Sequence, residues 1–139
     1  MNQISFCQMR WMMRTTDYLK HRISNERDGT IRISACVSRI PKDRRNHSQI
    51  EESVIEIVDM ENECRELETR LKEMQDILDS LIGGLDNPND RVLLRLRYMK
   101  CFRPEDIAGI SHHTINFIYH ALGRAERALI RLFPDLVRT

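Results

Sequence analysis

The sequence predicts an all-α protein, in which an N-terminal helical hairpin or coiled coil precedes a C-terminal domain of three short helices. Two patterns support this fold class: an apolar seam with heptad spacing in the middle of the chain, and a series of helix-start signals in the last third. The composition agrees, because 31% of the 139 residues are charged and only 6% are aromatic, which is unusual for an aromatic-packed sandwich. No apolar run approaches the roughly 18 residues that a transmembrane helix needs, so we expect no membrane association.

Residues 1–14 lack the apolar stretch of a signal peptide, and three methionines crowd there at Met9, Met12 and Met13. We expect this segment to be a flexible extension outside the fold. The four cysteines are widely spaced and form no Cys-x-x-Cys pair; they are Cys7, Cys36, Cys64 and Cys101. In a chain without a signal peptide, this usage indicates reduced thiols and a cytoplasmic location.

Residues 15–84 are expected to form the helical hairpin or coiled coil. Residues 15–37 have a weak helical pattern, which Asp28-Gly29-Thr30 kinks or splits. Residues 38–48 contain a proline and a basic cluster, and they are typical of a loop. The run Lys42-Asp43-Arg44-Arg45 either contacts phosphate or is a solvated loop, and we favour the solvated loop.

The clearest element is a helix over residues 48–82. Ser48 with Glu51 three residues later is a capping-box pattern, and Gly83-Gly84 ends the helix. Its apolar residues step alternately by four and three, which is an a/d seam over three heptads: Met60, Cys64, Leu67, Leu71, Met74, Leu78 and Leu81. Such a stripe must be covered, either by helix 15–37, by a second copy in a homodimer, or by a partner protein.

The net charge of +1 conceals a strong segregation along the chain. Residues 1–47 have a net charge of +6, residues 48–87 of −9, and residues 88–139 of +4. A basic C-terminal third beside an acidic middle predicts different partners for the two parts, and a basic domain is compatible with nucleic-acid binding.

Residues 85–139 carry three helix-start signals. Asn87 is a cap followed by Pro88 at the first helical position, and this helix is expected to run to Met99 with Val92, Leu93 and Leu96 buried. A short helix follows from Pro104 to Ala108, then a turn from Gly109 to His113. Thr114 caps a third helix that ends near Phe133-Pro134, with a buried stripe of Ile118, Leu122, Ala125 and Leu129.

Two short helices joined by a brief turn, with an alanine where they cross, describe a helix-turn-helix. The other face of the third helix carries polar residues that can meet base edges or phosphates in a major groove: Asn116, Tyr119, His120, Gly123, Arg124 and Arg127. The alternative is a purely structural three-helix cap whose polar surface binds no DNA.

Residues 87–129 resemble region 4 of sigma-70 factors, and more specifically small phage and prophage regulators of the ArpU/RinA-like type. The residues that match the family pattern are Pro88, Arg91, Leu93, Leu94, Arg97-Tyr98, Glu105-Asp106-Ile107-Ala108, Thr114, Ile118 and Arg124-Ala125. Upstream, Tyr18-Leu19 and the segment 57–63 are similar to a family of phage proteins of unknown function, so the resemblance covers about residues 15–132. It implies a sigma-70 region 4-like DNA-binding domain and a transcription regulator of phage or mobile-element origin.

The chain departs from this pattern at two places. Arg103-Pro104 replaces the usual Ser/Thr-Trp, so the cap side chain is lost while proline still starts the helix. Ser111-His112 replaces the Leu-Gly of the turn, which puts histidine where a positive φ is often needed, at an energetic cost.

We therefore expect a DNA-binding transcription regulator that reads the major groove with helix 114–131. The expected DNA-contacting residues are Arg103, His113, Thr114, Asn116, Tyr119, His120, Arg124 and Arg127. Two alternatives remain open: an adaptor that binds RNA polymerase or another protein without a DNA site of its own, and a coiled-coil assembly protein whose C-terminal helices are a cap. We expect no enzyme and no cofactor, because phosphate-binding and catalytic motifs are absent. The spacings of Cys101, His112, His113 and His120 match no common zinc site.

Overall fold

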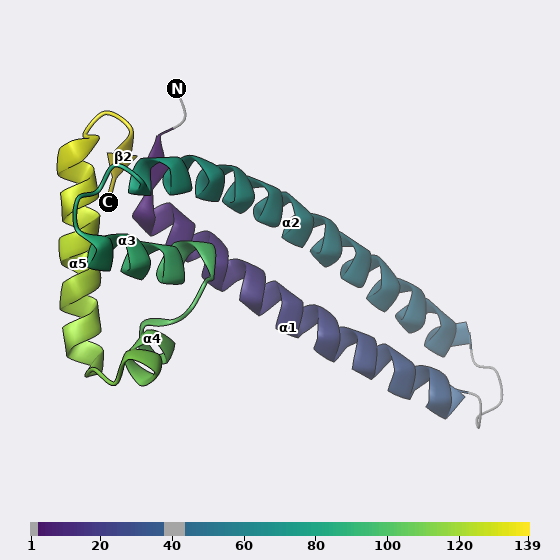
Figure 1. Cartoon of the computed structure of the whole chain (residues 1–139). Coiled ribbons are helices and arrows are strands. Elements are labelled where there is room, and N and C mark those ends of the chain that lie inside the picture. Colours follow the sequence, from purple (N-terminus) through teal and green to yellow (C-terminus); the bar gives the residue numbers. More distant parts are fainter. Residues whose placement is uncertain (1–2, 38–43) are drawn as a thin grey trace. The chain divides into compact units, whose positions relative to one another are not determined.

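The computed structural model describes residues 3–37 and 44–139, and it confirms the all-α fold class (Figure 1). The elements follow the order β1 (Ile4–Ser5), α1 (Phe6–Val37), α2 (Arg44–Ile82), α3 (Pro88–Leu94), the π-helical segment η1 (Arg95–Met99), α4 (Pro104–Ser111), α5 (Ile115–Leu132) and β2 (Val137–Arg138). The chain divides into two compact units, which are described separately below: residues 14–69, and residues 1–13 together with 70–139.

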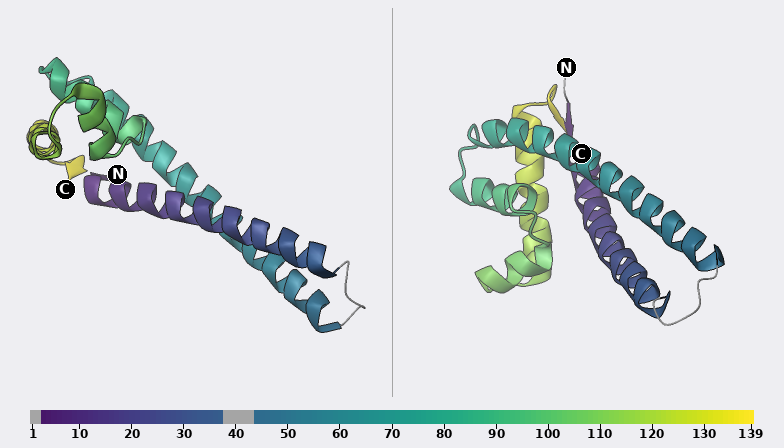
Figure 2. Two further views of the ribbon diagram at one scale, coloured as in Figure 1. Left: turned by 90° about the horizontal axis from the view of Figure 1, so that it is seen from below. Right: turned by 90° about the vertical axis from the view of Figure 1, so that its right-hand side faces the viewer.

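The unit of residues 14–69 is an antiparallel hairpin of α1 and α2, and its two helices lie side by side in all views (Figures 1 and 2). Ion pairs join the helices at two levels: Lys20 Nζ lies 2.8 Å from Glu68 Oε1, and Arg27 pairs with Glu61. The predicted seam is buried here at Cys64 and Leu67. Of the three ways to cover the seam, the structure therefore shows the one within the chain, against α1.

Two boundaries within this hairpin differ from the sequence-based expectation. α1 runs without interruption past Gly29, and nothing lies within 4 Å of a Cβ added there. α2 begins at Arg44, so Ser48 lies inside the helix and is not its N-cap. A single glycine costs a helix only about 1 kcal/mol, which the rest of a long helix outweighs. The expected phosphate-binding or loop run of residues 42–45 lies outside the residues whose side chains are described.

The second unit begins with the N-terminal segment, which is not the flexible extension expected for residues 1–14. Strand β1 pairs in parallel with β2, with Ile4 opposite Val137. Met9 and Phe6 are fully buried, and the Phe6 ring lies 5.0 Å from that of Tyr98. The methionines that were expected to mark a flexible terminus are core residues, because the first turns of α1 complete a hydrophobic core whose other parts come from residues 70–139.

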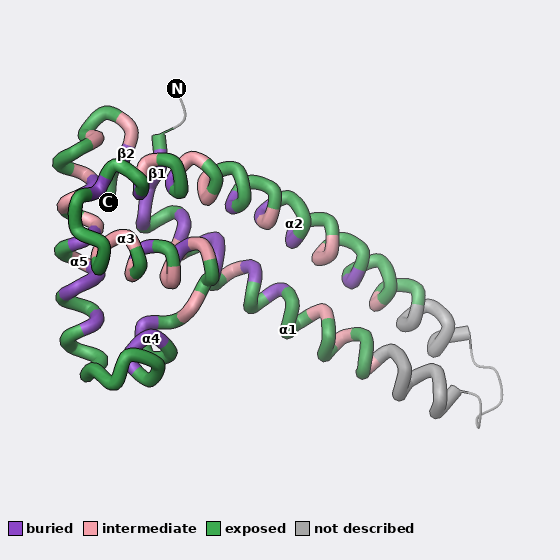
Figure 3. The backbone as a smooth tube through the Cα atoms, in the orientation of Figure 1, coloured by how far each residue is buried: buried purple, intermediate pink, exposed green. Residues whose placement is uncertain are grey.

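The core of this unit collects residues from every one of its helices, as the buried stretches in Figure 3 show. Its largest fully buried side chains include Phe6, Met9, Leu78, Ile82, Leu94, Tyr98, Ile107, Ile118, Leu129 and Val137. α2 ends at Ile82 as predicted, and Gly84 follows it. A Cβ on Gly84 would lie 3.2 Å from Cζ of Phe133, so the missing side chain allows Phe133 to pack there.

The helix expected over residues 88–99 begins as predicted and then changes its geometry. Asn87 accepts a hydrogen bond from the Asn89 amide at 3.0 Å, with Pro88 in the first turn. At η1 the Lys100 amide bonds to the Arg95 carbonyl five residues back. The face that is buried carries Leu94 and Tyr98, whereas Val92, which we expected in the core, is 55% exposed.

Candidate nucleic-acid interface

The candidate interface is built on α4 and α5, which pack against each other and against the preceding helix. Ile107 and Ala108 of α4 form a buried cluster with Ile118 and Leu122 of α5, and Leu93, Leu96 and Phe102 pack against it. Ala108 is 5% exposed, in agreement with the small residue predicted where the two helices cross. This cluster holds α5 in place through apolar contacts on its inner side, leaving the outer side free.

The turn between the two helices contains a left-handed residue. α4 extends to Ser111, three residues beyond the expected end, and His112 then adopts φ 58° and ψ 32°. The His113 amide bonds to the Ala108 carbonyl at 3.2 Å, which is the Schellman type of helix ending. The positive φ predicted at this histidine is confirmed, and a side chain there costs about 1 kcal/mol because its Cβ crowds the backbone.

Side chains at the starts of the two helices satisfy amides that have no partner within the helix. Thr114 Oγ1 accepts a hydrogen bond from the Phe117 amide at 3.2 Å, which confirms the predicted cap of α5. At α4 the Asp106 carboxylate accepts from the Arg103 amide at 3.3 Å. Arg103 cannot return that bond, because a guanidinium has only donors. α4 therefore begins without a side-chain cap at Arg103, as expected from the sequence.

α5 separates its buried and exposed sides cleanly. The predicted inner stripe is buried at Ile118, Leu122, Ala125 and Leu129. All eight expected contact residues are exposed: Arg103, His113, Thr114, Asn116, Tyr119, His120, Arg124 and Arg127. Asn116, His120 and Arg127 follow one another at spacings of four and seven residues, so they share the outermost face of the helix.

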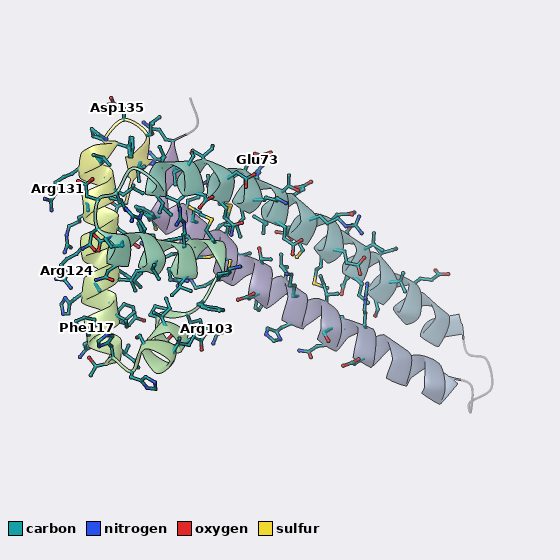
Figure 4. The ribbon with its side chains drawn as sticks, viewed as in Figure 1. Glu73, Arg103, Phe117, Arg124, Arg131 and Asp135 are labelled. Carbon is teal, nitrogen blue, oxygen red and sulfur yellow. The ribbon has the colours of Figure 1, made fainter. Side chains whose placement is uncertain are left out.

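The remaining expected residues are arranged around that face rather than on it. Tyr119 Oη donates to Glu105 Oε1 at 3.4 Å, which draws the phenol toward α4. The His113 ring stacks on Phe117 with 4.3 Å between centroids. Arg124 lies along α5 and Arg103 at the beginning of α4 (Figure 4). The structure therefore brings Asn116, His120 and Arg127 together, with the others at the flanks.

The charge on α5 is one-sided because its single acidic residue points inward. Glu126 accepts a hydrogen bond from the Tyr98 hydroxyl, and its Oε1 lies 3.1 Å from Nη1 of Arg10. Burial raises the pKa of the Tyr98 phenol, and the Glu126 carboxylate raises it further, so the phenol remains protonated and donates. Three arginines stay on the exposed side, at positions 124, 127 and 131. The outer face of α5 consequently carries positive charge with no carboxylate.

A groove of about 510 Å³ lies beside α5, between that helix, α3 and the end of α4. Its walls include three large apolar side chains that are substantially exposed: Val92 at 55%, Ile110 at 62% and Phe117 at 45%. Arg124 and Asp90 also line it. The groove was not predicted from the sequence, because regular helical periodicity places Val92 in the core.

Within residues 3–37 and 44–139 no group of three His, Cys, Asp or Glu side chains has a geometry that could hold a metal ion. No helix of that part of the chain is both long enough and apolar enough to cross a bilayer. Comparisons with models of protein families, with curated proteins and with solved structures find no match in any of the three.

Proposed function

We propose that the protein is a sequence-specific DNA-binding transcription regulator that reads the major groove with α5. The observation that carries the proposal is the one-sided charge of this helix: three exposed arginines, and one glutamate turned inward onto Tyr98 and Arg10. Duplex DNA is a dense array of negative charge, so a helix face with arginines and no carboxylate favours it. The resemblance of residues 87–129 to sigma-70 region 4 supports the same function and a phage or mobile-element origin.

In this proposal the residues on α5 have different tasks. Asn116 sits in the first turn of the helix, where an amide can pair with two positions on an adenine edge. His120 and Arg127 lie further along the same face of α5, toward the DNA backbone that flanks the bases. Arg124 and Arg103 neutralise phosphates at the edges and His113 contacts one, which sets the orientation of the helix without reading sequence.

The test is selection of bound duplexes from a random library with the purified full-length chain. Salt at about 0.1–0.15 M damps non-specific phosphate binding, so enrichment reports base recognition. We expect an enriched motif, and a two-fold symmetric motif would add that the protein binds as a dimer. Absence of any enriched motif from a folded sample would refute autonomous DNA recognition.

Single substitutions then distinguish residues that read the bases from residues that position α5 on the phosphates. Asn116→Ala should relax the base preference at one position of the motif, whereas Arg127→Ala should weaken all duplexes and reduce the salt slope by about 1. Arg65→Ala is the matched control, because it removes the same charge from an exposed site on the acidic helix α2. If Arg65→Ala weakens binding as much as Arg127→Ala, overall charge and not the α5 face is responsible.

The groove beside α5 favours a second candidate function, an adaptor that binds RNA polymerase or another protein. Exposed Val92, Ile110 and Phe117 offer an apolar surface that a DNA reader does not need. Phe117→Ser should abolish co-purification with RNA polymerase if the groove is the contact. Retention of polymerase by this variant would exclude the groove as its binding surface.

A homodimer remains part of the proposal, but it would not use the a/d seam. Within the hairpin, the buried residues Cys64 and Leu67 lie on the side that faces α1. Among the α2 residues of this hairpin whose burial is described, Val54, Ile55 and Val58 are large, apolar and exposed. These residues offer a second copy an apolar surface.

A further inference from the structure

A glycine interrupts the exposed face of α5, and helices normally avoid glycine. Gly123 lies near the middle of this helix of 18 residues. A glycine inside a helix lowers the folding equilibrium by a factor of about two to five relative to alanine, because its unfolded backbone has more freedom to lose. A glycine in the middle of the helix that is proposed to contact DNA therefore requires a physical reason.

No contact with the described residues, 3–37 and 44–139, supplies that reason. A Cβ built on Gly123 would meet only the guanidinium of Arg127, with Nη1 at 3.6 Å and Nη2 at 3.9 Å. These are ordinary van der Waals distances to the far end of a flexible side chain, so alanine fits the fold without displacing backbone or core. The backbone of Gly123 is helical and has no positive φ that would demand glycine.

The position of Gly123 relates it to the outermost face of the helix. It follows Asn116 by seven residues and His120 by three, and it precedes Arg127 by four. These spacings place the four residues on one side of α5. Gly123 is thus a gap in the face, and the Arg127 guanidinium lies over that gap.

We propose that Gly123 is the point at which α5 lies closest to DNA, and that its missing side chain sets how deeply the helix enters the major groove. This inference rests on the proposed function. A glycine lets a backbone approach a ligand more closely than any other residue does. The helix axis then lies near the groove floor, and the flexible Arg127 side chain, which covers Gly123 in the free protein, turns aside toward a phosphate.

The experiment compares two alanine substitutions that have the same effect on the helices and different positions relative to DNA. Gly123→Ala fills the proposed contact point. Gly109→Ala is the matched control, because Gly109 is an exposed glycine within α4 that has nothing within 4 Å of its Cβ position. Thermal unfolding is followed by circular dichroism, and binding by fluorescence anisotropy with the best duplex selected for the parent chain.

Both variants should raise Tm by about 2–5 °C, since each replaces glycine by alanine in a helix. Gly123→Ala should nevertheless weaken duplex binding by roughly tenfold or more, as expected for a methyl group forced into a packed contact. Gly109→Ala should bind as the parent does. The expected result for Gly123→Ala is therefore a higher Tm together with weaker binding of the duplex.

The failures of the two proposals are distinguishable. If the parent selects a duplex and Gly123→Ala binds it equally well, the close-approach inference is wrong while DNA binding stands. A fall in Tm for Gly123→Ala would also overturn the inference, because it would reveal an internal need for glycine. If the parent selects no duplex, the proposed function fails and this inference fails with it.

Discussion

Removal of the Arg10 guanidinium should destabilise the unit formed by residues 1–13 and 70–139, although Arg10 belongs to a segment that the sequence predicted to be loose. Its Nη1 atom donates to Tyr98 Oη at 3.0 Å and to Glu126 Oε1 at 3.1 Å. Arg10→Ala leaves the Glu126 carboxylate, whose side chain is only 15% exposed, without a neutralising cation. The prediction therefore tests the N-terminal segment and the inward-facing glutamate together.

The magnitude follows from the distance and from the remaining solvent. Two unit charges 3.1 Å apart attract by about 5 kcal/mol at an effective dielectric constant of about 20. Much of this is offset by the cost of removing both groups from water, and truncation of one partner of a fully buried pair costs about 3–5 kcal/mol. The Arg10 side chain is 30% exposed, so water relieves part of the penalty. We expect a loss of about 2 kcal/mol.

Urea unfolding measures this loss, with Trp11 fluorescence as the probe for this unit and circular dichroism as the probe for the helices. Trp11 is the chain's one tryptophan and is the next residue after Arg10. A loss of about 2 kcal/mol corresponds to a fall of about 1 M in the urea midpoint. Arg95→Ala is the control, because Arg95 Nε lies 3.2 Å from Asp79 Oδ1 but both side chains are about half exposed. That variant should lose about 0.5 kcal/mol or less.

Equal losses in the two variants would refute the argument from burial, since the two pairs differ mainly in exposure. A negligible loss in Arg10→Ala would refute the stronger claim that residues 3–13 are part of the folded unit. In that case the sequence-based expectation of a flexible extension would be the better description.

Three further predictions concern local geometry and pH. Thr114→Ala should lower the free energy of unfolding by about 1 kcal/mol through loss of the α5 cap, whereas Thr114→Ser should keep most of the stability that the cap provides. Equal Tm values for the two variants would contradict the cap. His112→Gly should gain about 0.5–1 kcal/mol in chemical unfolding by relieving a positive φ, whereas His112→Val should lose stability. The pKa of Tyr98 is raised in the folded protein, and an unfolded tyrosine ionises near pH 10, so its contribution is present below about pH 10 and declines as the pH rises above it. Tyr98→Phe should therefore flatten the alkaline loss of stability, by at most about 1.4 kcal/mol per pH unit, in urea titrations above about pH 9; an unchanged slope would argue against Tyr98 as a source.

Several features of this protein were predictable because their causes lie within a few residues. Asn87 and Thr114 cap helices by bonding to amides two and three residues ahead, so their type and spacing are sufficient signals. The inner stripe of α5 was also predictable, because helical periodicity alone places Ile118, Leu122, Ala125 and Leu129 on one side. The positive φ of His112 was predicted from the resemblance, because histidine stands where the similar turn usually has glycine.

The features that only the tertiary structure decided depend on residues far apart in the chain. Phe6 is buried because Tyr98 lies against it, and Glu126 turns inward because Arg10 and Tyr98 supply partners. Neither pairing has a local pattern. Val92 is exposed, whereas Leu94 and Tyr98 of the same helical run are buried, because the packing of this run against the rest of the unit selects that face. Local hydrogen bonds and periodicity thus determined where the helices begin and which side of α5 is apolar, whereas long-range packing decided which segments share a core and where the charges point.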